Sequence, residues 1–405
     1  MKTILEINGT NYGSSGTIAL NIAKEARNSG FKVYTSCKNS RVSKRFNNED
    51  QIYIGLWSER IISSVLSYIT GLRDHFNILG TYFFINKIKK INPNLIHLHV
   101  LHDTFINYNI LFNYIKKNNI PTVWTFHDCC GFTGQCPHFQ MAKCDKWKTG
   151  CHNCPQLHVE PESLIFDTTK HIYNWKKNLY GDLNNLTIVT PSKWLADIVK
   201  ESFLKDKDIR VINNGIDLDI FKPRESDFKS KYNVDDKYII LGVANAWVPR
   251  KGLDDFIELS KTLPSNYQIV LVGTNDEVDK KLPDNIISIH RTYDQKELAE
   301  IYTSADVFFN PTKEENFPTV NIESLACGTP VLTYKTGGSP EIIDEKSGYV
   351  LPTNDFKEAK NKIVEICENN LYKKEDCINR AQLFNRSSCF TKYVDLYKEI
   401  IEPGI

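Results

Sequence analysis

Residues 3–36 have the sequence TILEINGTNYGSSGTIALNIAKEARNSGFKVYTS, and the pattern in this stretch decides the fold class. Residues 3–7 and 32–36 are β-rich runs, and residues 17–29 repeat apolar side chains at helical spacing. A glycine loop at 13–16 joins the first run to the helix. A strand, a loop, a helix and a second strand form the unit from which parallel sheets are built. The sequence therefore predicts an α/β fold.

The same alternation continues along the chain. Further apolar β-rich runs lie at 94–98, 122–126, 186–190, 238–244, 268–272, 286–290, 307–310 and 330–333. A chain of 405 residues exceeds one ordinary core, so two domains of roughly 200 residues each are expected. We predict two doubly wound, Rossmann-like domains, at 1–190 and 191–386. A cysteine-rich insertion is expected at 129–156, and a final helix at 387–405 is expected to pack back on the first domain.

The composition restricts the classes of function. Apolar residues make up 41% of the chain and charged residues 24%, and the net charge is +1, so no global attraction for nucleic acid is expected. No secretory signal and no apolar run of about 18 residues is apparent, which predicts a cytoplasmic protein. The segment 61–91 is apolar and aromatic but contains several charges. Packing helices are favoured there over a membrane-touching surface.

Two glutamates lie eight residues apart in the stretch 315–323, ENFPTVNIE. Glu315 falls in the loop after a predicted strand, and Glu323 falls in the helix that follows. A carboxylate accepts hydrogen bonds from two neighbouring hydroxyls, so the two glutamates can bind a hexose and a ribose. Backbone N–H groups at the start of that helix suit a phosphate or a sugar hydroxyl. Alone, the pair is more typical of one helix-capping and one solvated glutamate.

Two cations stand at the start of the second domain's first helix. Arg250 and Lys251 precede Gly252 there. A guanidinium and an ammonium beside a helix N-terminus suit a diphosphate, although in isolation they are more typical of a solvated pair. Their occurrence together with 315–323 and with Gly337-Gly338 favours a nucleotide-sugar site.

In order and spacing, these motifs resemble those of the retaining glycosyltransferases of family 4, which have the GT-B fold of two Rossmann-like domains facing a cleft. The resemblance covers nearly the whole chain. It rests on residues 13–16, 127–128, 190–194, 214–217, 250–252, 315–323 and 337–338. Within the family, residues 127–155 look like the colanic-acid and capsular polysaccharide subgroup.

The resemblance implies a role for each matching residue. Arg250 and Lys251 would hold the diphosphate and stabilise it as the leaving group. Glu315 would contact the donor sugar, Glu323 would accept the ribose hydroxyls, and His127 would face the donor sugar across the cleft. The other donor-binding residues implied are Gly13, Ser15, Gly16, Asn316, Phe317, Pro318, Thr319 and Val320.

One position departs from the family pattern. Many members have an arginine five residues before the lysine, where this chain has Ala246. Lys251 therefore carries its role over better than Arg250, whose side chain could instead face solvent.

The resemblance implies transfer of a hexose from a nucleotide diphosphate, with UDP favoured, to a glycan or lipid-linked acceptor in surface polysaccharide assembly. Two cations on the diphosphate replace a metal, so no cofactor is expected for catalysis. Peripheral contact with the inner membrane face fits the subgroup. A non-catalytic GT-B partner subunit and a transferase with a protein acceptor stay open as alternatives. A nicotinamide-dependent dehydrogenase is disfavoured, because 33–36 supplies no acidic residue after the first helix.

Four cysteines have the spacing C-x7-C-x6-C-x2-C, at Cys136, Cys144, Cys151 and Cys154. Four thiolates with one C-x2-C pair suit a tetrahedral structural zinc, with His138 and His152 as substitute ligands. Reduced thiols and disulfides are the other two interpretations. A second cluster, His97, His99 and His102, is expected to line the ligand crevice at a strand end, with a metal site as the less favoured hypothesis.

Overall fold

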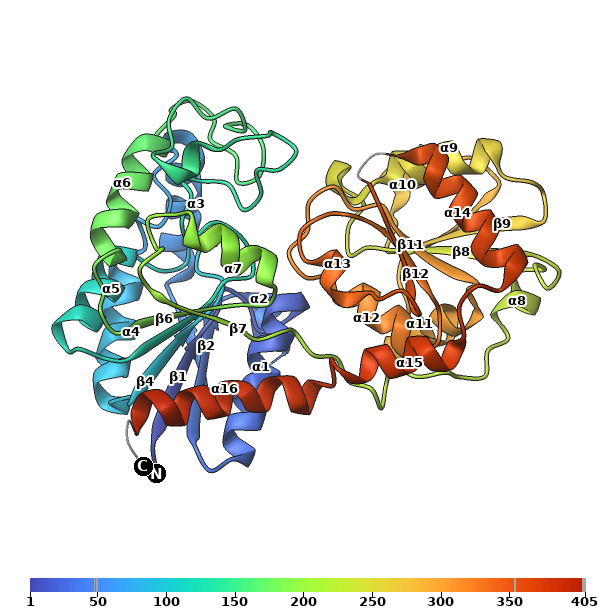
Figure 1. The fold of residues 1–405 in the computed structure, drawn as a ribbon. Coiled ribbons are helices and arrows are strands. Elements are labelled where there is room, and N and C mark those ends of the chain that lie inside the picture. The colour runs from blue at the N-terminus through green and yellow to red at the C-terminus, as the bar shows by residue number, and fades with distance from the viewer. Residues whose placement is uncertain (47, 49, 353–354, 403–405) are drawn as a thin grey trace. The chain divides into compact units, whose positions relative to one another are not determined.

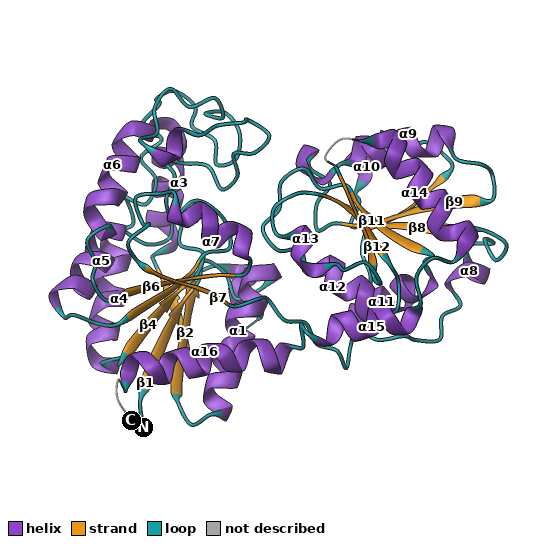
Figure 2. Cartoon of the chain, viewed as in Figure 1, coloured by secondary structure: helices purple, strands orange, loops and turns teal. Residues whose placement is uncertain are grey.

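The computed structural model describes residues 1–46, 48, 50–352 and 355–402, which form two compact units (Figure 1). Unit 1 comprises residues 1–213 and the C-terminal segment from Cys389, and unit 2 runs from Asn214 to Ser388. In each unit a central sheet is covered by helices on both faces (Figure 2). This is the doubly wound α/β architecture that the sequence predicts.

Unit 1 is built around a parallel sheet of seven strands in the order β3-β2-β1-β4-β5-β6-β7. Its strands are β1 (Thr3–Ile7), β2 (Lys32–Lys38), β3 (Gln51–Ile54), β4 (Leu95–Leu98), β5 (Thr122–Thr125), β6 (Leu186–Thr190) and β7 (Asp208–Val211). Its helices are α1 (Gly13–Asn28), α2 (Arg41–Arg45), α3 (Trp57–Thr70), α4 (Ile78–Ile91), α5 (Tyr108–Lys117), η1 (Lys146–Lys148), α6 (Thr169–Tyr180), α7 (Lys193–Lys200) and α16 (Arg386–Ile401).

Unit 2 has a parallel sheet of six strands in the order β10-β9-β8-β11-β12-β13, the Rossmann order of two βαβαβ halves. Its strands are β8 (Tyr238–Val243), β9 (Tyr267–Val272), β10 (Ile286–Ile289), β11 (Val307–Asn310), β12 (Val331–Tyr334) and β13 (Gly348–Leu351). Its helices are α8 (Phe228–Lys231), η2 (Pro249–Lys251), α9 (Leu253–Thr262), α10 (Asp276–Asp279), α11 (Gln295–Ser304), α12 (Thr319–Ala326), α13 (Ser339–Ile342), α14 (Phe356–Asn369) and α15 (Lys374–Gln382).

The glycine loop expected at 13–16 is instead the first turn of α1. The helix begins at Gly13, and the connection from β1 is the segment 8–12. Gly13 has a φ of 71°, a conformation that glycine adopts without strain, so the chain can turn sharply into the helix. Gly16 is buried, and a Cβ there would lie 2.9 Å from the Asn11 backbone. Helix and loop therefore approach each other closely.

The sequence predicted a domain boundary at 190/191, but the boundary between the units lies at 213/214. The difference arises because β7 pairs in parallel with β6 and extends the sheet of unit 1. Helix α16 lies along that sheet and buries Phe390, Tyr393 and Tyr397 in one apolar cluster with Ile4 and other strand residues. Residues 403–405 of the predicted final helix lie outside the described residues.

Helix α3 departs from the expectation that 61–91 forms ordinary packing helices, whereas α4 agrees with it. The buried residues of α3 are Ser63 and Ser67, and large apolar side chains along it are exposed, with Ile62 at 60% and Val65 at 52%. Helix α4 packs through Phe84, Ile85 and Ile88 on its inner side. Among the residues that the structure describes, none of the helices combines the length and apolar character that crossing a bilayer requires.

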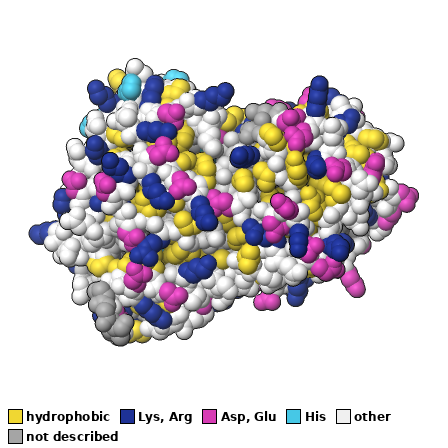
Figure 3. All heavy atoms as spheres, in the orientation of Figure 1, with side chains coloured by type: hydrophobic (Ala, Val, Ile, Leu, Met, Phe, Trp, Pro, Cys, Tyr) yellow, Lys and Arg dark blue, Asp and Glu magenta, His cyan; other side chains and the backbone are white. Residues whose placement is uncertain are grey.

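Basic and acidic side chains are interspersed on the face of the molecule that Figure 3 shows. A large field of one sign, as nucleic-acid binding uses, is not visible on that face.

Candidate active site

The two candidate cations of unit 2 lie on a tight turn beside the loop that follows β11. Arg250 and Lys251 end the short helix η2, and Gly252 follows with a φ of 74°. A Cβ at Gly252 would lie 2.4 Å from the Pro311 carbonyl oxygen, so only glycine lets the turn approach this loop so closely. The backbone N–H of Lys313 donates to the Arg250 carbonyl oxygen at 2.7 Å and ties the two segments together.

Lys251 and Glu315 form an ion pair inside this arrangement. The distance from Lys251 Nζ to Glu315 Oε2 is 2.5 Å, and both side chains are about four-fifths buried, at 20% and 18% exposure. Arg250 is partly exposed, and its Nη1 donates to the Glu314 carbonyl oxygen at 3.2 Å. The structure therefore brings three of the four predicted catalytic residues together, Arg250 and Lys251 from η2 and Glu315 from the loop after β11.

The remaining residues of the predicted donor loop lead into helix α12. Asn316, Phe317 and Pro318 are buried, and Thr319 and Val320, which begin the helix, are partly exposed. The ring of Phe317 packs edge-on against Phe384 at a centroid distance of 5.8 Å. Its side chain belongs to the core, so only its backbone is available to a ligand.

Glu323 lies one turn further along α12, four residues after Thr319. Its Oε2 accepts a hydrogen bond from the Tyr302 hydroxyl at 3.3 Å. Burial raises the pKa of Glu323 to about 7, against the opposing effect of the Tyr302 and Thr319 hydroxyls. A carboxylate in this state exchanges its proton near neutral pH and is well suited to accept hydroxyl donors from a ligand.

We expect Glu323 to make the stability of the protein depend on pH. Its folded pKa lies above its ordinary value of 4.5, so between about pH 4.5 and 7 the folded state holds a proton that the unfolded state has released. The free energy of unfolding should therefore fall as pH rises through this window, by at most about 3 kcal/mol from this group. Denaturant unfolding at pH 5 and pH 8 should show this fall in the wild type. The Glu323→Gln variant should show a smaller fall, and an identical fall in both proteins would contradict the assignment.

His127 follows β5 in unit 1 and is the partly exposed end of a histidine pair. Its Nε2 lies 3.2 Å from Nδ1 of His99, which is buried at the end of β4. Burial and the neighbouring His99 lower the pKa of His127 to about 3, so the ring is neutral. A neutral imidazole at this position can donate to, or accept from, a sugar hydroxyl.

A second pair adjoins His127 in the chain. His102 Nε2 lies 2.7 Å from Asp128 Oδ2. Burial acts to lower the pKa of His102, but the Asp128 carboxylate outweighs it and holds that pKa well above its usual range. The three clustered histidines are thus not one metal site: His97 and His99 group with Glu6, and His102 groups with Asp128 and Cys130.

In the first turn of α1, Gly13 and Ser14 are exposed, Ser15 is partly exposed and Gly16 is buried. Nothing lies within 4 Å of a Cβ built at Gly13, so the start of α1 is open to a ligand. Helix α1 has sixteen residues and presents its first backbone N–H groups there.

The four cysteines converge in the insertion between β5 and α6. Cys136, Cys144, Cys151 and Cys154 all line one small cavity of about 20 Å³, and these four are not joined by disulfides. The insertion has η1 as its regular structure among the described residues. Lys176 of α6 holds it, donating to the carbonyl oxygens of Cys130 at 2.7 Å and Thr133 at 3.2 Å.

Sequence reasoning missed Glu6, which is 1% exposed and lies 3.7 Å from His99. A charged residue within the otherwise apolar run of β1 was the signal that could have found it.

Two models of known protein families match this chain. The family model described as Glycosyltransferase Family 4 matches residues 15–220, and the one described as Glycosyl transferases group 1 matches residues 224–384. The chain belongs to glycosyltransferase family 4. A putative colanic acid biosynthesis glycosyl transferase from Escherichia coli K12 is 25% identical over 359 residues, which cover 83% of this chain and 84% of that protein.

Solved structures of glycosyltransferases share the fold. Sucrose-phosphate synthase from Thermosynechococcus elongatus matches with a TM-score of 0.72 and 19% identity, covering 99% of both chains. HepE from Anabaena, solved with UDP-glucose, matches with a TM-score of 0.70 and 15% identity, covering 98% of this chain and all of that chain. The two Rossmann-like units are those of the GT-B fold, as the sequence predicted.

Proposed function

We propose that this chain is a retaining, metal-independent hexosyltransferase that uses a UDP-sugar in surface polysaccharide assembly. The observation that carries the proposal is the Lys251–Glu315 ion pair, which lies with Arg250 beside the start of α12. A cation for the diphosphate and a carboxylate for the sugar hydroxyls stand within 2.5 Å of each other. Glu323 then offers a second carboxylate for the ribose.

Two relatives support the choice of donor and product. HepE from Anabaena binds UDP and UDP-glucose, which favours a uridine nucleotide here. The Escherichia coli relative is named for colanic acid biosynthesis, which favours a glycan product.

The residues of unit 2 suit the charge changes of the reaction. When the bond from the anomeric carbon to the diphosphate oxygen breaks, negative charge develops on the diphosphate and positive charge on the sugar. Lys251 and Arg250 stabilise the former. The acceptor hydroxyl attacks the anomeric carbon from the face of the leaving group and transfers its proton to the departing phosphate oxygen, so no metal or protein base is required. His127 and the first turn of α1 are the proposed contribution of unit 1 to donor binding.

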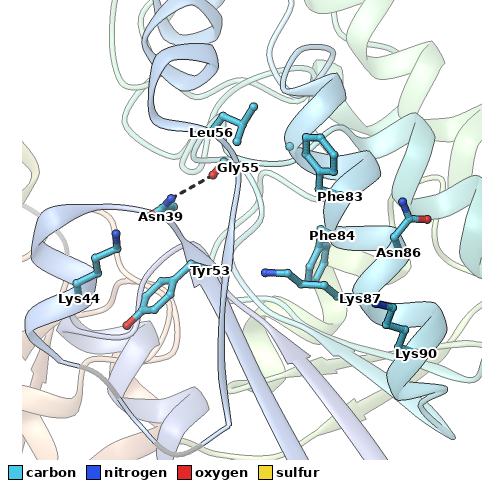
Figure 4. A pocket seen from close by; sticks show the side chains of 11 residues that line it. Asn39, Lys44, Tyr53, Gly55, Leu56, Phe83, Phe84, Asn86, Lys87 and Lys90 are labelled. Carbon is cyan, nitrogen blue, oxygen red and sulfur yellow. Dashed lines mark hydrogen bonds between the residues drawn. The ribbon is translucent and has the colours of Figure 1, made fainter.

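We propose that the acceptor binds in a surface pocket of unit 1. A pocket of about 490 Å³ lies between α2, β3 and α4, bordered by Lys44, Lys87 and Lys90 and by the rings of Tyr53 and Phe83 (Figure 4). Lysines beside aromatic rings suit an acceptor that carries both an anionic group and apolar or sugar rings.

The exposed apolar side chains beside this pocket favour a lipid-linked acceptor. Helix α3 exposes Trp57, Ile62 and Val65, and helix α4 exposes Leu79 and Tyr82. Exposed apolar rows next to lysines are typical of contact with an anionic membrane surface. We therefore propose that the protein acts at the cytoplasmic face of a membrane.

A transfer assay tests the proposal. The full chain is incubated with UDP-glucose, UDP-galactose, UDP-N-acetylglucosamine or GDP-mannose, with and without EDTA, and with lipid-linked, water-soluble glycan or protein acceptors. We expect transfer from one UDP-sugar to a lipid-linked acceptor, undiminished by EDTA and with retained anomeric configuration in the product. Binding of UDP-sugars without transfer to any acceptor would support a non-catalytic subunit instead.

We also propose that Cys136, Cys144, Cys151 and Cys154 hold a structural zinc. They are spread over residues 136–154 and line one cavity, in a segment with little regular structure to stabilise it. Burial is the largest effect that raises the pKa of Cys136, and the other three thiols contribute to it, which reflects their proximity. The four sulfurs are not all within 4.8 Å of one another, so binding requires them to close to about 3.8 Å.

Metal analysis of the purified full chain should find about one zinc per protein. Cys151→Ser should lose the metal and lower the thermal midpoint, because a structural zinc contributes directly to folding. The matched control is Cys367→Ser, a buried cysteine of α14 outside the cluster, which should keep the zinc. Protein that is free of zinc when purified without chelator, and whose midpoint does not respond to added zinc, would contradict the proposal.

A further inference from the structure

A line of three polar side chains runs from the core of unit 1 to His127. Glu6, His99 and His127 come from β1 and from the ends of β4 and β5, which are neighbouring strands in the sheet. His99 Nε2 lies 3.7 Å from Glu6 Oε2, and His99 Nδ1 lies 3.2 Å from His127 Nε2. Glu6 and His99 are 1% and 2% exposed, so His127 is the member that reaches the surface.

His97 lies against this line but is not part of it. Its Nδ1 is 2.6 Å from the Tyr397 hydroxyl, and its Nε2 is 2.8 Å from the Thr125 hydroxyl. Both ring nitrogens are therefore occupied. This argues against a metal ion held by Glu6, His97 and His99, although their ligand atoms all lie within 4.8 Å of one another.

The proton positions follow from burial. His99 Nε2 has no hydrogen-bond partner. A buried carboxylate is costly, and burial raises the pKa of Glu6 well above its usual range, while Arg27 and a hydrogen bond from the Tyr397 hydroxyl act in the opposite direction. Burial also lowers the pKa of His99 to about 3. Glu6 is thus a neutral carboxylic acid and His99 a neutral imidazole.

One arrangement of hydrogen bonds satisfies these neutral groups and leaves His127 Nδ1 protonated. In this arrangement the Glu6 acid O–H points at His99 Nε2, and the single ring proton of His99 is on Nδ1 and is donated to His127 Nε2. His127 in turn carries its proton on Nδ1, the nitrogen that this line leaves for a ligand. The 3.7 Å gap between Glu6 and His99 is longer than a hydrogen bond. Such contacts commonly shorten when a ligand binds.

We propose that Glu6 and His99 are positioning residues that hold His127 as the neutral tautomer protonated at Nδ1, so that it donates a hydrogen bond to a hydroxyl oxygen of the donor sugar. This inference rests on the proposed function for the identity of the ligand. A neutral donor matters because positive charge develops on the sugar as the bond to the diphosphate breaks, and an imidazolium at this place would repel it.

Nitrogen-15 NMR of the histidine rings tests the inference, because the two ring nitrogens have different shifts when protonated and when bare. The His127 signals are assigned in the full chain by their loss in His127→Gln. We expect His127 to be protonated at Nδ1 in the wild type. Glu6→Gln should keep this state, since its amide N–H can donate to His99 Nε2 as the acid does.

Glu6→Leu and His99→Phe should shift His127 toward the Nε2-protonated form and lower kcat about tenfold, the effect expected for one misdirected hydrogen bond. Both variants are tested, so that failure of one to fold leaves the other. An Nε2-protonated His127 in the wild type, or a tautomer unchanged in both variants, would overturn the inference. Absence of transfer by the wild type would overturn the proposed function, while the NMR signals would still decide the tautomer.

Discussion

Lys251→Ala should lower kcat/KM with the UDP-sugar donor by a factor of about 100 to 1,000, the usual loss when one preorganised group that stabilises developing charge is removed. Two neighbouring residues, Gly252 and Glu315, position Lys251 for this role. Gly252 allows the close approach to the Pro311 segment, and Glu315 holds the ammonium at 2.5 Å. The expected loss should appear mainly in kcat, because charge on the diphosphate increases as the bond breaks. Steady-state kinetics on the purified variant measures it.

Lys261→Ala is the matched control for this variant. Lys261 lies on α9 of the same unit and forms an exposed ion pair with Glu258 at 2.6 Å. An exposed pair of this kind contributes little to stability, and its loss should leave both activity and folding unchanged. A threefold change in kcat/KM corresponds to a difference of less than about 1 kcal/mol in activation free energy. If Lys251→Ala retained kcat/KM within about threefold of the wild type, Lys251 would not contact the leaving group.

The central strands could be predicted from the sequence because burial leaves a clear pattern. β4, β5 and β6 are buried at every residue and appear in the chain as short apolar runs. The strands β3, β7 and β13 were not predicted. β7 is an edge strand with three of its four residues exposed, so it lacks the apolar run that marks a buried strand. Missing β7 also explains why the predicted domain boundary came too early.

Helix α3 shows a different limit of sequence reasoning. Its apolar residues recur at helical spacing, and such a stripe ordinarily faces a core. Here the side that carries Ser63 and Ser67 is buried instead. Periodicity identifies the helix and its two sides, but which side meets the rest of the unit depends on contacts made by distant segments.

The candidate site could be predicted by residue type but not by pairing. The motifs located Lys251 and Glu315, which are 64 residues apart, but not their ion pair. The contact between His99 and His127 likewise depends on β4 and β5 being neighbours in the sheet. Glu6 was overlooked because a buried carboxyl group has no spacing signature.

Gly337→Ala should destabilise unit 2 and weaken nucleotide binding, although the substitution adds a single methyl group. Gly337 has a φ of 55°, and a Cβ there would lie 1.7 Å from the Glu315 carbonyl oxygen. The left-handed conformation costs alanine about 1 kcal/mol, and relieving the clash requires movement of backbone, which adds about 1–3 kcal/mol. That backbone carries Glu315 and is also held by the Gly338 N–H, which donates to the Asn316 carbonyl oxygen at 2.8 Å. A lower thermal midpoint and at least about tenfold weaker binding of UDP by calorimetry are expected.

Gly30→Ala separates the two causes of this loss. Gly30 also has a positive φ, 89°, but nothing lies within 4 Å of a Cβ built there. Its replacement should therefore cost only the conformational strain, about 1 kcal/mol, and leave UDP binding unchanged. Equal effects of the two substitutions on UDP affinity would mean that the contact between Gly337 and the Glu315 segment does not position the donor site. A loss confined to Gly337→Ala would show that the approach of these two loops, rather than glycine's freedom alone, holds Glu315 in place for the sugar.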